Sequence, residues 1–161
     1  MGETYWPCSF EKEMIIWLTG QPGSGKTTIA NNLLIRLNNH QKKIINIDGD
    51  NLRSILINKD YSREGRIKNI KVAQNIAQFL HEKNFIVIVS LVAPFLDVRE
   101  DFKSRCNVNE VYLETTEIRG REHFFSKDYK KPINNFLYLD TGKNSVEECT
   151  DKVLSFCKLD E

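Results

Sequence analysis

The chain has 161 residues, which fits one domain and is long enough to bury its own hydrophobic core. Its 23 basic and 22 acidic side chains leave a formal net charge of +1 at pH 7, so no overall field attracts it to nucleic acid or to a membrane. The apolar runs are far too short to span a bilayer and the N-terminus lacks an export-signal pattern, so we expect a cytoplasmic protein.

The first predicted elements are an arm, a strand and a helix. Residues 1–13 show no apolar period, and we read them as an irregular N-terminal arm before a single domain at 14–161. The continuous apolar run at 14–19 is typical of a strand buried on both faces. A glycine-rich segment follows, and from about Thr27 the apolar residues recur with helical spacing.

Strands and helices continue to alternate along the rest of the chain. Strands are predicted at 43–47, 85–90, 110–114 and 136–139, and helices from 62 onward, at 97–106 and from 145 onward. The last helix opens with an S-x-x-E capping box, and two of the four scattered cysteines, Cys149 and Cys157, lie on its apolar side. The polar, basic segment 119–135 has no clear period and is predicted to be a mobile loop. This alternation predicts an α/β fold of three layers, with a mostly parallel sheet between helices.

The glycine-rich segment carries the clearest chemical signal. Residues 20–27 read G-Q-P-G-S-G-K-T and match the phosphate-binding P-loop pattern G-x-x-x-x-G-K-[ST] in full. Converging backbone N–H groups and the N-terminus of the following helix would bind phosphates. In this interpretation Lys26 reaches the β- and γ-phosphates of ATP, and the Thr27 hydroxyl binds Mg²⁺. The predicted ATP-binding residues here are Gly20, Gly23, Ser24, Gly25, Lys26, Thr27 and Thr28.

Two acidic residues end the second predicted strand, in the sequence D-G-D-N-L-R at 48–53. Ligands of an open parallel sheet gather beyond the carboxyl ends of its strands, so both carboxylates would face the P-loop. If the bound ATP donates its terminal phosphoryl group to the hydroxyl of a second substrate, the acceptor, we predict that Asp50 orients or deprotonates that hydroxyl. Asp48 is predicted to lie nearer the magnesium ion. Arg53 would pair with an anionic substrate. The alternative is that D-G-D-N forms only a turn and a helix cap.

Further candidate residues lie near the same edge of the predicted sheet. Arg66 and Asn69 are three residues apart on one helical face, where a bound anion would contact both, and Ser90 ends the third strand. Arg119 and Arg121 lie in the polar loop, which in kinases of this fold acts as a lid whose arginines close on the phosphates. No N-K-x-D sequence for guanine recognition is present, which disfavours a GTPase.

These segments resemble the adenylylsulfate (APS) kinases from about residue 14 to residue 158. GQPGSGKTT, IDGDNLR, INKDYSREGRIKNIKVAQNIAQFL and FIVIVSLVAPFLDVRE follow the order and spacing of that family. The family has a P-loop kinase fold and uses MgATP to phosphorylate the ribose 3′-hydroxyl of adenylyl sulfate. The resemblance implies that Asp48 and Asp50 are its paired acids, and that Arg53, Arg66 and Asn69 contact adenylyl sulfate.

The chain also departs from the family pattern. Tyr61 stands where the family has Leu-Gly-Phe, whose phenylalanine stacks on adenine, so Tyr61, Phe124 or Phe125 would supply that ring here. Gly65 replaces an aspartate of the family, and the long lid with its K-G-L-Y sequence is absent. Ala93 replaces a serine sometimes proposed to carry phosphate, which favours direct in-line transfer.

We therefore predict a kinase that uses ATP and Mg²⁺ to phosphorylate adenylyl sulfate, with small nucleotides as its partners. The sequence does not decide between a monomer and a homodimer. One alternative is a P-loop kinase for another small nucleotide-linked or sugar acceptor, as in surface-polysaccharide pathways. A second is a nucleotide-binding module with little turnover. The intact set Lys26, Thr27, Asp48 and Asp50 argues against that module, whereas the shortened lid argues for it.

Overall fold

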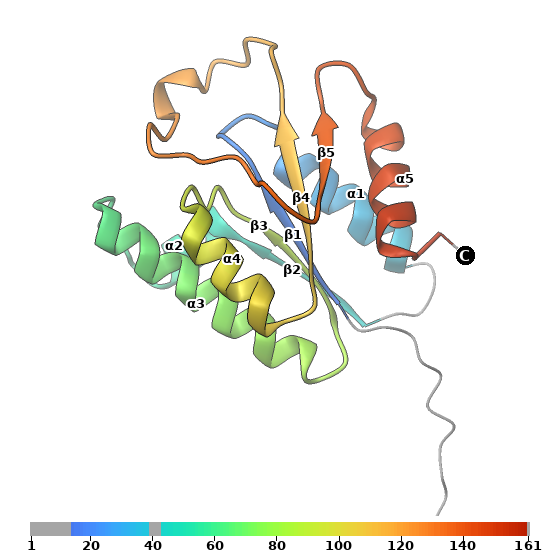
Figure 1. The fold of residues 1–161 in the computed structure, drawn as a ribbon, viewed down its shortest axis with the longest axis horizontal. Coiled ribbons are helices and arrows are strands. Elements are labelled where there is room, and N and C mark those ends of the chain that lie inside the picture. The colour runs from blue at the N-terminus through green and yellow to red at the C-terminus, as the bar shows by residue number, and fades with distance from the viewer. Residues whose placement is uncertain (1–13, 39–42, 161) are drawn as a thin grey trace, which may run out of the picture.

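A five-stranded parallel sheet forms the middle layer of the computed structural model, which describes residues 14–38 and 43–160 (Figure 1). The strands are β1 (Ile15–Thr19), β2 (Ile44–Asp48), β3 (Ile86–Ser90), β4 (Val108–Glu114) and β5 (Phe136–Asp140), in the order β2-β3-β1-β4-β5. All neighbouring strands pair in parallel. The predicted arm at 1–13 lies outside the described residues.

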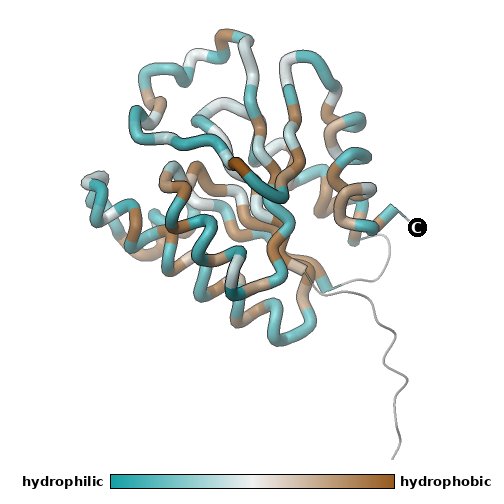
Figure 2. Tube along the Cα trace, viewed as in Figure 1, coloured by the Kyte–Doolittle hydropathy of each residue, from teal (hydrophilic) through white to brown (hydrophobic). Residues whose placement is uncertain are grey.

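Helices cover both faces of this sheet, which confirms the predicted three-layer α/β fold (Figure 1). Helices α1 (Lys26–Asn38) and α5 (Val146–Cys157) cover one face, and α3 (Arg63–His81) and α4 (Leu96–Arg105) cover the other. Figure 2 shows the hydrophobic residues concentrated in the strands and along the inner sides of the helices. The element boundaries differ from the predicted ones by only a few residues.

The two hydrophobic cores explain why the sequence of β1 is apolar without interruption. Ile16 and Leu18 point into the core under α1 and α5, whereas Ile15 and Trp17 point into the core under α3 and α4. Alternate residues of a strand face opposite sides of a sheet, so a strand covered on both faces needs apolar residues at every position. Each fully buried side chain of this size stabilises the fold by about 1.5–3 kcal/mol.

The strand order places a ligand crevice at β1. Strands β2 and β3 lie on one side of β1, whereas β4 and β5, which follow later in the sequence, lie on its other side. The direction in which successive strands are placed in the sheet therefore reverses at β1. In open α/β sheets, ligands bind in the crevice outside the carboxyl ends of the strands at such a reversal. The P-loop that follows β1 lies at this crevice.

Two segments differ from their sequence-based descriptions. The short helix α2 (Gly49–Ile55) was not predicted; it follows β2 directly and has Asp48 as its N-cap. The segment between β4 and β5, which we call the lid, contains one turn of 3₁₀ helix, η1 (Glu122–Phe124), within otherwise irregular backbone.

The C-terminal helix has the predicted cap and the predicted buried cysteines. The Ser145 hydroxyl accepts from the backbone of Glu148 while the Glu148 carboxylate accepts from that of Ser145, which confirms the capping box. Cys149 and Cys157 are buried free thiols, and burial raises the pKa of Cys157 to about 12. In the two described ranges, no helix is long and apolar enough to cross a membrane.

Candidate functional site

A cleft of about 850 Å³ opens beyond the carboxyl ends of β1, β2 and β3. It extends from the P-loop across α2 and the start of α3 to the lid. The predicted site residues that line it are Gly23, Gly25, Lys26, Thr27, Thr28, Asp48, Asp50, Arg53, Tyr61, Arg66, Asn69, Ser90, Arg119, Arg121 and Phe125. Two predicted ATP-binding residues, Gly20 and Ser24, do not line the cleft but support the loop from behind.

The backbone of the P-loop depends on glycine at two places. A Cβ atom at Gly20 would lie 2.3 Å from the carbonyl oxygen of Leu113, so any side chain would push the loop away from β4. Gly25 has a φ of +97°, a conformation that residues with a Cβ rarely adopt. Ser24 is buried, and its carbonyl accepts a 2.8 Å hydrogen bond from the Thr141 hydroxyl.

Lys26 is held within the P-loop by backbone carbonyls. Its ammonium donates to the carbonyl oxygens of Gly20 at 2.9 Å and Gln21 at 2.8 Å. Burial of the ammonium lowers the pKa of Lys26 to about 8, although nearby Asp50 and Asp48 act in the opposite direction. A desolvated cation at a helix N-terminus is suited to a phosphate group, which would replace the missing water.

Asp48 is both a helix cap and a residue of the cleft. One carboxylate oxygen accepts from the backbone N–H groups of Asp50 and Asn51, each at 3.1 Å, so Asp48 caps α2. The other accepts from the hydroxyls of Ser90 at 3.3 Å and Thr27 at 3.4 Å. The cap therefore fixes the orientation in which Asp48 faces the P-loop. Asp50 follows in the first turn of α2, exposed to solvent at the wall of the cleft.

The oxygen atoms near Thr27 fit a magnesium ion. Among the described residues, no group of three or more histidine, cysteine, aspartate or glutamate side chains gathers to bind a metal. Mg²⁺ does not need such a cage, because it is usually held by one or two carboxylates, substrate phosphates and water. A carboxylate oxygen of Asp48 beside the hydroxyl of Thr27 is a donor set of this kind.

The opposite wall of the cleft carries cationic and aromatic groups. Arg66 donates from Nη1 to the Ser126 hydroxyl at 3.1 Å. Asn69 is buried, and its side-chain oxygen has no hydrogen-bond partner within the described part of the chain. Arg53 lies 4.4 Å from the ring centre of Tyr61 and donates to backbone carbonyls of the α2–α3 loop. The structure therefore brings the predicted acceptor residues together and uses Arg53 in part to hold the loop that carries Tyr61.

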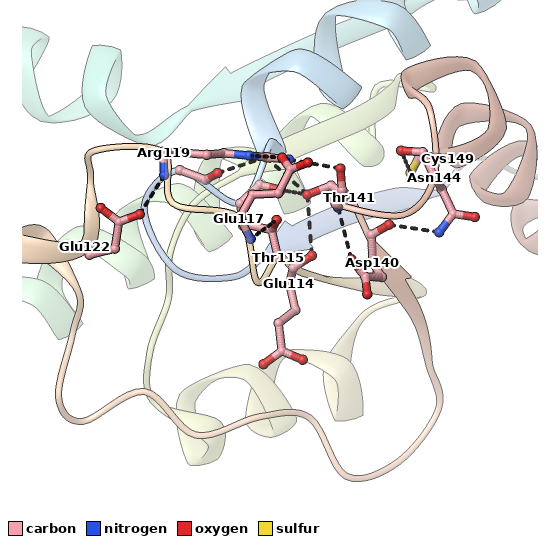
Figure 3. A network of polar contacts seen from close by, with 12 residues as sticks. Glu114, Thr115, Glu117, Arg119, Glu122, Asp140, Thr141, Asn144 and Cys149 are labelled. Atoms are coloured by element: carbon pink, nitrogen blue, oxygen red, sulfur yellow. Dashed lines mark hydrogen bonds and ion pairs between the residues drawn. The ribbon is translucent and has the colours of Figure 1, made fainter.

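The two arginines of the lid have different surroundings. Arg119 donates to the Gly23 carbonyl at 3.0 Å, to Thr141 and to the Glu117 carboxylate, as Figure 3 shows in part. Its guanidinium thus ties the lid to the P-loop and to the β5–α5 turn. Arg121 packs on Gly23, with its Cβ 3.1 Å from the position of a Cβ added there, and lines the cleft.

Three site residues were missed by the sequence analysis. The side chain of Gln21 pairs with the backbone of Ser126 through two hydrogen bonds, of 2.9 and 3.0 Å. Thr141 joins the P-loop to the end of β5. Gln21 and Ser126 are 105 positions apart, and Gln21 occupies an unspecified position of the P-loop pattern, so no local signal marked them.

Comparison with known proteins shows the family. Residues 12–148 match the family model of adenylylsulphate kinase. The adenylyl-sulfate kinase of Bacillus velezensis is 32% identical over 179 aligned positions, which cover 97% of this chain and 90% of the relative. The cytidine diphosphoramidate kinase of Campylobacter jejuni is 37% identical over 131 positions, covering 78% of this chain and 77% of that protein.

A solved structure shows the same fold. The APS kinase of Mycobacterium tuberculosis in complex with AMPPNP and APS superposes with a TM-score of 0.79 at 23% identity, covering 90% of this chain and 97% of that one. The family model and the Bacillus velezensis relative confirm the resemblance predicted from the motifs. The chain belongs to the adenylylsulphate kinase family, ATP-dependent phosphotransferases that act on a hydroxyl group.

Proposed function

We propose that this protein transfers the γ-phosphoryl group of ATP to the ribose 3′-hydroxyl of adenylyl sulfate, in the cytoplasm. One observation carries the proposal: a single cleft joins the P-loop and the acid pair to a wall with Arg66, Asn69 and Tyr61. The phosphosulfate of adenylyl sulfate needs cationic donors, and its adenine needs an aromatic surface. Both are present on the wall of the cleft that lies opposite the P-loop.

We assign the P-loop and Lys26 to binding ATP, the phosphoryl donor. The backbone N–H groups at the start of α1 bind the phosphates of ATP, and Lys26 neutralises charge that grows on the transferring group. Thr27 and Asp48 hold Mg²⁺, which when bound supplies positive charge to the phosphate oxygens. Arg121 closes the same region from the lid side.

We assign Asp50 the role of general base for the acceptor hydroxyl. The 3′-oxygen attacks the γ-phosphorus in line, the bond from phosphorus to the ADP oxygen breaks, and the hydroxyl proton passes to the Asp50 carboxylate. Asp48 is less suited to take this proton, because its oxygens already accept from Asp50, Asn51, Ser90 and Thr27. Ala93 at the cleft wall has no hydroxyl to carry phosphate, which supports transfer without a phosphoenzyme at that position.

The acceptor assignment is tested by ADP release against a panel of acceptors. We expect adenylyl sulfate to stimulate ADP release far above the rate with ATP alone, and to be converted to its 3′-phosphate. No stimulation by any acceptor would favour a nucleotide-binding module with little turnover. Light scattering on the same preparation measures whether the protein is the homodimer that the sequence leaves open.

A second candidate acceptor is cytidine diphosphoramidate. It is favoured by the Campylobacter jejuni relative, which has a higher identity to this chain than the Bacillus velezensis relative does. Tyr61 is 64% exposed at the mouth of the cleft, where a pyrimidine would stack as readily as a purine. Including this nucleotide in the panel separates the two: efficient use of it, with none of adenylyl sulfate, would overturn the first proposal and keep the kinase activity.

Removal of the Arg66 guanidinium should weaken acceptor binding. Losing a charge-assisted hydrogen bond typically costs about 1.5–3 kcal/mol, so Arg66→Ala should raise the acceptor's KM about ten- to hundredfold. The KM of ATP should hardly change, because Arg66 lies on the far wall. Tyr61→Ala should also raise the acceptor's KM, but by a smaller factor. Steady-state kinetics measures both, with Lys68→Ala, an exposed cation of the same helix outside the cleft, as the matched control.

The lowered pKa of Lys26 predicts a pH dependence. Because burial holds this pKa at about 8 in the free protein, Lys26 loses its charge as the pH rises through that value. The kcat/KM for ATP should therefore fall above about pH 8, whereas kcat should fall only at higher pH, since bound phosphates stabilise the ammonium.

Rate profiles at constant ionic strength test this pH dependence. An arginine at this position in Lys26→Arg stays charged over the whole range of the assay, so the residual activity of this variant should not fall at alkaline pH. A wild-type kcat/KM that stays flat well beyond the pKa of Lys26 would contradict the prediction.

A further inference from the structure

A chain of hydrogen bonds connects the P-loop to the acceptor wall through the lid. It begins at Gln21, whose carbonyl accepts from the Lys26 ammonium at 2.8 Å. The Gln21 side chain points the other way and pairs with the backbone of Ser126: its amide nitrogen donates to the Ser126 carbonyl at 3.0 Å, and its oxygen accepts from the Ser126 N–H at 2.9 Å. One residue thus contacts both the phosphate-binding lysine and the lid.

The next link joins the lid to Arg66. The Ser126 hydroxyl accepts from Nη1 of Arg66 at 3.1 Å, and Ser126 is buried. The long side chain of an arginine otherwise samples many rotamers, and ordering it on binding costs conformational entropy. The bond to Ser126 fixes the guanidinium at the wall of the cleft before any acceptor arrives.

The chemistry of this link preserves the charge of Arg66. Within the described ranges, no carboxylate forms an ion pair with Arg66. A carboxylate partner would neutralise the guanidinium, whereas a serine hydroxyl orients it and leaves its positive charge for a substrate anion. An arginine has five N–H donors, and the contact with Ser126 occupies one of them.

A second tie limits how far the lid can move relative to the P-loop. Arg119 donates to the Gly23 carbonyl at 3.0 Å, so the lid is fastened to the P-loop at both Arg119 and Ser126. The intervening segment, which carries Arg121 and Phe125, lines the cleft between these two points. The position of Ser126 is therefore set by the P-loop.

We propose that Gln21 and Ser126 form a bridge that positions Arg66 relative to the P-loop, which makes Ser126 a positioning residue for the acceptor anion. The bridge ties the cation that binds the acceptor to the loop that binds the phosphoryl donor, so the two substrates are held at a defined separation. The inference rests on the proposed function in assigning Arg66 to the acceptor.

A double-mutant cycle tests whether Ser126 acts through Arg66. Ser126→Ala removes only the hydroxyl and keeps the backbone pairing with Gln21. We expect the acceptor's KM to rise about 3- to 10-fold, with kcat and the KM of ATP unchanged within about twofold. In an Arg66→Ala background the same change should have no further effect. The matched control is Ser104→Ala. Ser104 is an exposed serine of α4, and its hydroxyl donates a hydrogen bond to a backbone carbonyl.

Two results would overturn the positioning role. One is an unchanged acceptor KM in Ser126→Ala, and the other is an equal increase of that KM in the wild-type and Arg66→Ala backgrounds. The cycle is run with whichever panel nucleotide the wild type phosphorylates. Failure of adenylyl sulfate as a substrate therefore rejects the proposed function separately from the bridge.

Limited proteolysis of the protein without substrates tests the Gln21 end of the bridge. Gln21→Leu removes both side-chain bonds, and Gln21→Glu places a carboxylate against the Ser126 carbonyl while still accepting from its N–H. Trypsin should cut after Lys127 several-fold faster in both variants than in the wild type, with a similar melting temperature. Equal cleavage rates in all three proteins would show that Gln21 does not hold the lid and would overturn the bridge.

Discussion

Replacing Lys26 by alanine is expected to lower turnover at least about a hundredfold, the effect of losing a major electrostatic stabiliser of a transition state. Negative charge on the transferring phosphoryl group is greatest in the transition state, so the ammonium contributes more to kcat than to ATP binding. The N–H groups at the start of α1 remain in the variant and still bind phosphate. Steady-state kinetics gives the turnover, and calorimetric titration with ATP gives the affinity.

The structure supplies the control for this experiment. The Lys26 ammonium donates to the carbonyls of Gly20 and Gln21 and to the Ser24 hydroxyl, so its removal also takes three hydrogen bonds from the P-loop. Lys26→Met removes the charge but keeps most of the side-chain volume, and should match the alanine variant in turnover. Near-normal turnover in both variants would exclude Lys26 from the chemistry, and complete loss of ATP binding would indicate that the loop had collapsed.

Replacing Asp50 by asparagine is expected to lower turnover about a hundred- to ten-thousandfold, the range typical of a general base. The amide has nearly the same shape but cannot take the proton of the acceptor hydroxyl. ATP affinity should stay close to normal, because the Asp50 contact to the helix cap comes from its backbone N–H and survives the substitution. Single-turnover kinetics with saturating substrates measures the chemical step directly.

Asp48→Asn provides the contrasting variant. Asparagine is as good an N-cap as aspartate, so α2 should still form, while the negative charge beside Thr27 is lost. We expect the Mg²⁺ requirement to rise in Asp48→Asn and to stay unchanged in Asp50→Asn. If the Mg²⁺ requirement instead rises only in Asp50→Asn, the two roles must be exchanged.

The fold and the core of the site could be predicted because their signals are local. The apolar run of β1, the P-loop pattern and the helical spacing after it are neighbours in the sequence, and each follows from short-range geometry. The acid pair could be placed because parallel strands bring their carboxyl ends to one edge. The short helix α2 could not be predicted, because seven residues give too few turns for an apolar period.

The hydrogen bonds of the lid could not be predicted from the local sequence. Its arginines are predicted to close on phosphates from the loop sequence alone, but the contacts of Arg119 with Gly23 and Thr141, 96 and 22 positions away, could not be predicted. The bond between Arg66 and Ser126 spans 60 positions, and the pairing of Gln21 with Ser126 spans 105. Side chains without a periodic pattern acquire their partners only when the chain is folded, since hydrogen bonds depend on distances of about 3 Å that residue spacing does not specify.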